Sequence, residues 1–115
     1  MLDLKDITYQ PQTGNKKILD DISFNLHENE IILICGKSGS GKTTLLEIIS
    51  GLITPQKGKI TWKNKNITAR QRRWISGVVF QFPERYFLGT TIGKELKIGY
   101  KSLREKNIEQ VLKKV

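Results

Sequence analysis

The stretch Gly36-Lys37-Ser38-Gly39-Ser40-Gly41-Lys42-Thr43 decides the fold of this chain. It matches the pattern G-x-x-x-x-G-K-[ST], in which backbone N–H groups turn inward and surround phosphate oxygens. Glycine adopts the backbone angles that such a turn needs without a Cβ clash, and Gly36, Gly39 and Gly41 supply three positions of this kind. The stretch therefore predicts a loop that binds the phosphates of a nucleotide.

The segments on either side of this loop fit the same prediction. Before it, the apolar run at residues 31–35 is typical of a parallel strand that is covered on both faces. After it, residues 42–50 have a helical pattern, and the N–H groups and dipole at a helix N-terminus favour an anion. Lys42 would bring a positive charge to the β- and γ-phosphates, and Thr43 would offer its hydroxyl group to Mg²⁺.

The remaining elements alternate between strand and helix. Apolar patterns predict strands at residues 2–9, 18–26, 59–62 and 77–80. Helices are expected near residues 91–96 and 103–114. An alternation of this kind predicts a fold of the α/β class.

The composition suits a globular domain. The 115 residues have a hydrophobic fraction of 37% and a net charge of +9, which we interpret as a solvated, lysine-rich surface. No apolar run approaches the ~20 residues that cross a bilayer. The N-terminus is not expected to be a secretory or transit peptide. The one cysteine, Cys35, lies in the apolar run before the loop, so a buried thiol is expected.

The sequence around the loop resembles that of ABC transporter ATPases, and the resemblance covers the whole chain. Residues 36–44 look like the Walker A loop of that family with its usual second threonine, and residues 18–24 are similar to the segment that precedes it. Val79-Phe80-Gln81 is similar to the strand that enters the Q-loop. The resemblance implies an α/β P-loop NTPase fold. The chain would be the N-terminal half of an ABC-type ATP-binding domain, with an antiparallel β subdomain and an incomplete core sheet.

The resemblance also implies a set of site residues. Tyr9 stands where the family places an aromatic ring that stacks on adenine, although an ordinary strand aromatic is the alternative interpretation. Gln81 corresponds to the Q-loop glutamine, which contributes to the site for Mg²⁺ and the γ-phosphate. The expected contacts of ATP are Tyr9, Gly36, Lys37, Ser38, Gly39, Ser40, Gly41, Lys42, Thr43, Thr44 and Gln81, with Thr43 and Gln81 at the metal ion.

Some features of the family pattern differ or are missing. Asn29 and Asn64 stand at turn positions where the family often has glycine, and asparagine can meet the same backbone demand. The sequence contains no Leu-Ser-Gly-Gly-type signature and no apolar run that ends in Asp-Glu, and His27 is its only histidine. No catalytic residue is expected beyond a contribution of Gln81, so the chain alone is not expected to hydrolyse ATP. Exposed apolar surface and a free sheet edge are expected.

The residues around Gln81 resemble those of one subfamily, with a second as the alternative. Phe80-Gln81-Phe82-Pro83-Glu84 and the later Thr91-Ile92 resemble the energy-coupling-factor type, as in cobalt and vitamin importers. The alternative is the soluble SufC-type ATPase of iron–sulfur cluster assembly, which shares a Phe-Gln-aromatic-Pro run. The importer type implies a transmembrane transporter subunit and a second ABC ATP-binding subunit as partners. It also implies a peripheral place on the cytoplasmic face of a membrane, or on the stromal side if the gene is plastid-encoded.

Three further hypotheses remain open. The chain could be another P-loop enzyme, such as a small kinase or GTPase, but the extended match on both sides of the loop argues against this. It could be a non-catalytic ATP-binding fragment. It could bind nucleic acid through Arg70-Gln71-Arg72-Arg73-Trp74, but we interpret this run as a solvated connection between two strands, which makes nucleic acid an unlikely partner.

Overall fold

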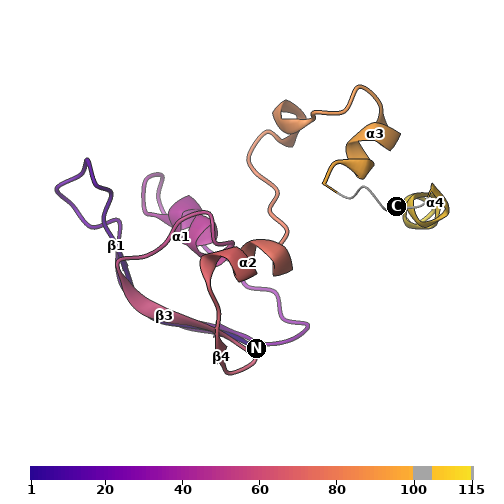
Figure 1. Cartoon of the computed structure of the whole chain (residues 1–115). Coiled ribbons are helices and arrows are strands. Elements are labelled where there is room, and N and C mark those ends of the chain that lie inside the picture. The colour runs from indigo at the N-terminus through magenta and orange to yellow at the C-terminus, as the bar shows by residue number, and fades with distance from the viewer. Residues whose placement is uncertain (100–104, 115) are drawn as a thin grey trace. The chain divides into compact units, whose positions relative to one another are not determined.

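The computed structural model describes residues 1–99 and 105–114. These residues form two compact units, Met1–Val78 and Val79–Val115. Figure 1 follows the chain from indigo at its N-terminus to yellow at its C-terminus. The first unit contains the sheet and the phosphate loop, and the second contains short helical elements.

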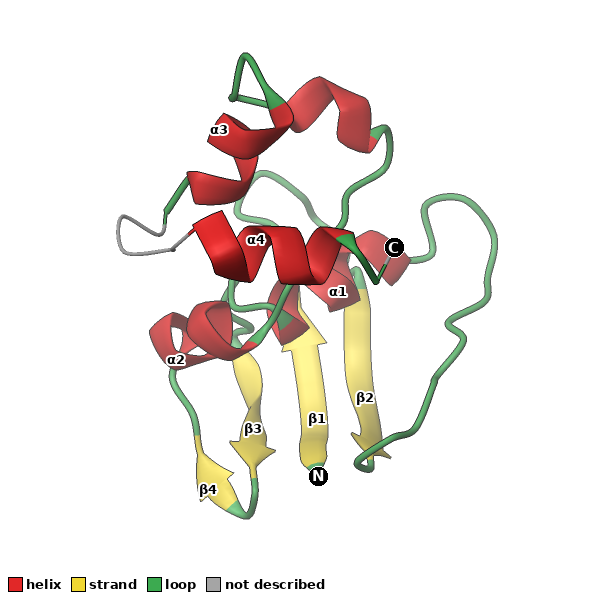
Figure 2. Cartoon of the chain, turned by 90° about the vertical axis from the view of Figure 1, so that its right-hand side faces the viewer, coloured by secondary structure: helices red, strands yellow, loops and turns green. Residues whose placement is uncertain are grey.

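An antiparallel sheet is the frame of the first unit. Its strands are β1 (Leu2–Tyr9), β2 (Leu19–Leu26), β3 (Lys57–Trp62) and β4 (Lys65–Asn66). Their spatial order is β2-β1-β3-β4, as the yellow arrows of Figure 2 show. β1 pairs antiparallel with both β2 and β3. The strands predicted at residues 2–9, 18–26 and 59–62 are confirmed, and so is the antiparallel β subdomain.

The alternation of β1 is interrupted at one place by a bulge. Leu4 is buried at an even position, whereas Ile7 is buried at an odd position. The pairing with β2 shifts between these two residues, and Asp6 has a φ of 53°. An extra residue therefore turns the strand and returns Ile7 to the core. Gly58 of β3 packs against this bulge, because a Cβ added to it would lie 2.6 Å from the carbonyl oxygen of Lys5.

The core of the first unit lies between the sheet and the helix α1 (Lys42–Ile49). Leu45 and Ile48 of α1 are buried together with apolar side chains of the strands, namely Leu2, Leu4, Ile7, Leu19 and Ile60. A second helix, α2 (Ala69–Ile75), lies on the same side of the sheet as α1 (Figure 1). The helix predicted at residues 42–50 is thus confirmed, and its buried face ties it to β1, β2 and β3.

The hydrophobic pattern does not predict α2, although the sequence contains a local signal for it. Thr68 Oγ1 accepts a hydrogen bond from the Gln71 N–H, and Gln71 Oε1 accepts one from the Thr68 N–H at 2.8 Å. This reciprocal arrangement is a capping box. The interpretation of the basic run as a solvated connection is wrong for Arg72, whose side chain is only 4% exposed. The helix turns Arg72 toward α1, where it donates to a backbone carbonyl.

Two predicted strands are not present. Residues 31–35 and 77–80 have no regular secondary structure, and Ile31 and Val79 are 96% and 84% exposed. A strand exists only where a neighbouring strand accepts its backbone hydrogen bonds. Within the described residues, no backbone–backbone hydrogen bond joins residues 31–35 to another segment. Cys35 is exposed for the same reason, so the prediction of a buried thiol is wrong. The expectation of exposed apolar surface is confirmed.

The two asparagines at predicted turn positions have the expected backbone conformation. Asn29 has a φ of 61° and Asn64 a φ of 63°. Both values lie in the left-handed region that asparagine tolerates better than most other residues. The replacement of glycine by asparagine at these turns therefore leaves the backbone path unchanged.

The second unit contains η1 (Pro83–Tyr86), α3 (Ile92–Lys97) and α4 (Glu105–Leu112). Thr91 caps α3, and Glu95 accepts hydrogen bonds from the N–H groups of Leu88, at 2.8 Å, and Gly89. Both predicted helices are confirmed. Leu103 and Val115, which belong to the predicted apolar face of the last helix, lie outside the described residues. In the part of the chain that the structure describes, no helix is both long enough and apolar enough to cross a membrane.

Candidate nucleotide-binding site

The phosphate loop joins residues 31–35 to α1 through backbone angles that favour glycine. Gly39 has a φ of 78° and Gly41 a φ of 90°, both in the left-handed region. Gly41 is also the N-cap of α1. A Cβ added to Gly41 would lie 2.9 Å from Leu19 Cδ2 and 3.0 Å from the carbonyl oxygen of Ile18. The loop therefore passes so close to the start of β2 that only glycine fits at this position.

Lys42 places its ammonium group within the loop. Lys42 Nζ donates hydrogen bonds to the carbonyl oxygens of Gly36, at 2.8 Å, and Lys37, at 2.7 Å, and approaches Ser40 Oγ at 3.5 Å. The Ser40 N–H donates to the Lys37 carbonyl oxygen at 3.2 Å. These contacts hold a positive charge inside the turn that residues 36–41 make. A phosphate group bound in the loop would therefore lie close to the Lys42 ammonium group.

The N-terminus of α1 is open to an anion. No side chain caps it, and its first turn has no acidic residue. The first N–H groups of a helix have no partner within the helix and carry a partial positive charge. Thr43, the first residue after Lys42, is exposed, and Thr44 is half-buried. The loop, the ammonium group and the helix N-terminus thus combine the features that bind phosphate, and the Thr43 hydroxyl is accessible for Mg²⁺. The residues present fit a bound Mg-nucleotide.

Tyr9 lies at the same end of the sheet as the loop. It is the last residue of β1 and pairs with Leu19 of β2, and its carbonyl oxygen accepts a hydrogen bond from the Ile18 N–H at 2.8 Å. Ile18 and Leu19 are the residues against which Gly41 packs. The Tyr9 side chain is half-buried and packs against the core. The fold therefore brings Tyr9 and the phosphate loop together through the start of β2, while its contact with adenine stays a prediction.

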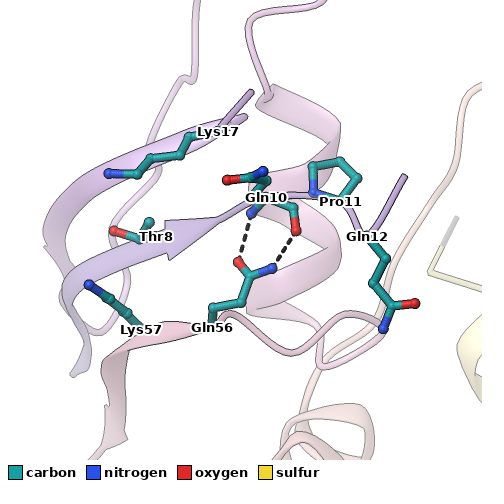
Figure 3. Close-up of a pocket in the computed structure, with 7 residues that line it drawn as sticks. All are labelled: Thr8, Gln10, Pro11, Gln12, Lys17, Gln56 and Lys57. Atoms are coloured by element: carbon teal, nitrogen blue, oxygen red, sulfur yellow. Dashed lines mark hydrogen bonds between the residues drawn. The ribbon is translucent and has the colours of Figure 1, made fainter. Parts of the chain in front are cut away.

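A pocket of about 340 Å³ lies beside the strand that carries Tyr9 (Figure 3). Gln56 closes one side of it: the Gln10 N–H donates to Gln56 Oε1 at 2.7 Å, and the Gln56 side-chain amide donates to the Gln10 carbonyl oxygen. Thr8, Pro11, Gln12, Lys17 and Lys57 complete its lining. The pocket contains none of the predicted site residues. The glutamine pair holds the loop after β1 against the start of β3, which gives it a structural role.

Gln81 lies in the second unit, unlike the other predicted site residues. Its side chain is exposed, and it precedes η1 in a segment without regular secondary structure. The contribution of Gln81 to a metal site therefore stays a prediction. The structure brings together Tyr9 and residues 36–44, all within the first unit.

Two side chains of the first unit have a shifted pKa. A hydrogen bond to Asp20 raises the pKa of Lys17, with a Nζ–Oδ1 distance of 2.7 Å, and both side chains are exposed. Burial lowers the pKa of the Arg72 guanidinium group, and the neighbouring Arg73 lowers it further. Arg72 is not among the predicted site residues, and only its position after the capping residue Thr68 indicates that it lies on a helix.

The profile of the ABC transporter family matches residues 19–115. Among curated proteins, the energy-coupling factor transporter ATP-binding protein EcfA2 of Clostridioides difficile is 38% identical over 94 residues, which cover 76% of this chain and 32% of that protein. The chain spans less than half the length of the curated relatives it matches. The resemblance inferred from the loop and its flanking segments is therefore confirmed.

Many solved structures are similar to the chain, and two of them show what the likeness covers. One is CbiO1 of Clostridium perfringens, part of the ABC transporter complex CbiONQ, with a TM-score of 0.78 and 27% identity; the match covers 95% of this chain and 46% of CbiO1. The other is an ATP-binding cassette in a dimeric post-hydrolysis state with bound ADP and phosphate. Its TM-score is 0.60 at 32% identity, over 70% of this chain and 39% of that one.

Proposed function

Because the chain belongs to the ABC transporter family, we propose that it binds the phosphates of Mg-ATP in the loop formed by residues 36–43. The observation that carries this proposal is the position of Lys42, whose ammonium group lies within 2.8 Å of two loop carbonyl oxygens beside an uncapped helix N-terminus. A positive charge and free N–H groups at one place favour a polyanion. The solved cassette with bound ADP and phosphate supports a nucleotide as the ligand.

Other residues extend the proposed site. The exposed Thr43 hydroxyl contributes a ligand to Mg²⁺, and the Tyr9 ring packs against the adenine base. Gln81 contributes to the metal and γ-phosphate site from the second unit. Mg²⁺ in such a site neutralises charge on the phosphates when it is bound. Lys42 and the N-terminal N–H groups of α1 hold the phosphates in place.

We infer that the protein that carries this sequence is the ATPase subunit of an importer of the energy-coupling-factor type, which hydrolyses ATP to drive transport. The similarity to EcfA2 and to CbiO1 supports this class over the SufC type. Its partners would be a transmembrane transporter subunit and a second ATP-binding subunit, and it would lie on the cytoplasmic face of the membrane. The 115 residues contain no apolar run that ends in Asp-Glu, the pattern that would supply the carboxylate orienting the attacking water, so this chain alone is not expected to hydrolyse ATP.

The test is a titration of the purified chain with a fluorescent ATP analogue in the presence of Mg²⁺, with phosphate release followed in the same samples. Lys42→Ala should weaken binding on the order of 10- to 100-fold, because a hydrogen-bonded charge at the phosphates is lost. Lys65→Ala is the matched control. It removes one positive charge from an exposed position in β4 and should leave the affinity unchanged.

Each result has a distinct meaning. Binding that depends on Lys42 without phosphate release would support ATP binding by a chain that needs further residues for hydrolysis. Phosphate release that depends on Lys42 would show that the chain is a complete ATPase. Equal loss of affinity in Lys42→Ala and Lys65→Ala would contradict a specific phosphate site.

A further inference from the structure

We propose that α2 is a positioning element for nucleotide binding, because its side chains hold the end of α1 that lies opposite the phosphate loop. This inference rests on the proposed function of the loop. The α1–α2 contact is formed by Arg72, Arg73 and Ser76 with the carbonyl groups of Ile48, Ser50 and Gly51. These residues all belong to the first unit.

The α1–α2 contact adds hydrogen-bond donors to carbonyl groups at the C-terminal end of α1, where the Ile48 carbonyl oxygen also accepts from the Gly51 N–H at 3.1 Å. Arg72 Nε donates to the Ile48 carbonyl oxygen at 3.1 Å, and Arg73 Nη1 donates to that of Gly51 at 2.7 Å. Ser76 Oγ, just after α2, donates to the Arg72 carbonyl oxygen at 2.8 Å and lies 3.4 Å from that of Ser50. The last carbonyl groups of a helix have no partner within it. Two arginine side chains of one neighbouring helix therefore supply donors at the C-terminal end of α1, and Ser76 lies beside them.

Charge reinforces these hydrogen bonds. The C-terminal end of a helix has a partial negative charge, which a nearby cation stabilises. The last turn of α1 contains no basic residue. Arg72 and Arg73 bring two guanidinium groups to this end from α2. The phosphate-binding helix thus receives its stabilising cations from a different element.

The burial of the charged Arg72 side chain opposes folding. Its side chain is 4% exposed, and Nη2 is buried without a hydrogen-bond partner. Its other two side-chain nitrogens make hydrogen bonds: Nε donates to the Ile48 carbonyl oxygen, and Nη1 donates to that of Ile67 at 3.2 Å. Burial of a charge with an unpaired nitrogen destabilises a protein unless other contacts compensate for it. The compensation here is the connection of α1 to α2 and to the turn before α2.

Close packing leaves α1 little freedom at this contact. A Cβ added to Gly51 would lie 2.2 Å from the carbonyl oxygen of Ala69, the first residue of α2. α1 has only eight residues, a length that is not stable as an isolated helix. Its buried residues Leu45 and Ile48 and the α1–α2 contact must therefore define its direction. That direction aims the N–H groups that follow Gly41 at the phosphates.

The test compares Arg73→Ala with Arg70→Ala in the full chain, by titration with the fluorescent ATP analogue and Mg²⁺. Arg73→Ala should weaken binding by the folded chain about fivefold, because only part of the free energy of a hydrogen bond to a charged group reaches the opposite end of α1. Arg70 is exposed on the same helix and makes none of the hydrogen bonds that α2 forms with α1, so Arg70→Ala should bind as the unchanged chain does. Arg73→Lys can still donate to Gly51 and should restore most of the affinity.

Two further readouts separate positioning from mere stability. Unfolding in urea gives the folded fraction, for which each affinity is corrected, and amide hydrogen exchange reports the first turn of α1. Arg73→Ala should speed exchange at Leu45, whose N–H donates to the Gly41 carbonyl oxygen at 2.8 Å, while Arg70→Ala should not. Ser76→Ala, a milder change of the same contact, should act in the same direction, whereas Arg72→Ala is avoided because the chain would lose a buried side chain.

The outcomes distinguish this inference from the proposed function. If the unchanged chain does not bind the analogue, the proposed function fails, and the exchange rates still test the α1–α2 contact. If Arg73→Ala lowers only the free energy of unfolding, with affinity and exchange at Leu45 unchanged, the positioning role is overturned.

Discussion

β1 and the run at residues 31–35 are both apolar segments that predict strands, yet only β1 is one. β1 lies between β2 and β3, and Leu4 and Ile7 are completely buried. The run before the phosphate loop has the more continuous apolar sequence, but Leu33 is 84% exposed. Hydrophobic residues stabilise a strand only when other segments cover them and accept its hydrogen bonds. The two segments therefore differ in whether neighbouring strands pair with them and cover their side chains.

The largest expected effect comes from truncating the same side-chain type in the two segments. Ile7→Ala should lower the free energy of unfolding by about 2–5 kcal/mol, because it leaves a cavity in the core. Ile31→Ala should change it by less than about 0.5 kcal/mol, since the side chain contacts mainly solvent. Urea denaturation measures both. If Ile7→Ala does not fold, Ile7→Val, with an expected loss of about 0.5–1.5 kcal/mol, replaces it. Equal losses at the two positions would mean that residues 31–35 are packed in solution.

A smaller effect is expected from two glycines in contrasting surroundings. Gly58 has a φ of 99° and packs against the bulge of β1, so Gly58→Ala should destabilise the first unit by about 1–3 kcal/mol. Gly77 lies in an exposed segment, and a Cβ added there would meet nothing within 4 Å. Gly77→Ala should be neutral or stabilise the chain by up to about 1 kcal/mol. Thermal unfolding of both variants checks this, and a loss at Gly77 would indicate packing of that segment.

The smallest effect is expected at Cys35. Because its side chain is exposed, Cys35→Ser should change the free energy of unfolding by less than about 0.5 kcal/mol. The Cys35 thiol should react with a disulfide reagent such as DTNB in the folded chain nearly as fast as in urea. Protection of the thiol that urea removes would show that another segment covers residues 31–35. Addition of Mg-ATP should slow the reaction only if the nucleotide orders the residues next to the loop.

Local signals in the sequence were sufficient to predict the phosphate loop and most of the secondary structure around it. Glycines at set positions, followed by Lys42 and a helical pattern, predict the phosphate loop and α1, because a turn and a helix N-terminus form from neighbouring residues. The same is true of the turns at Asn29 and Asn64. The family membership also follows from such short motifs. The adenine contact of Tyr9 and the metal contact of Gln81 stay predictions.

The tertiary structure alone decided which residues are covered. The pairing of β1 with β2 and β3, the bulge that returns Ile7 to the core, and the exposure of residues 31–35 all depend on segments far away in the chain. Arg72 appears in a basic run that is typical of a solvated surface, yet α2 buries it against α1. Burial is a property of contacts between distant segments, and these form only when the chain folds.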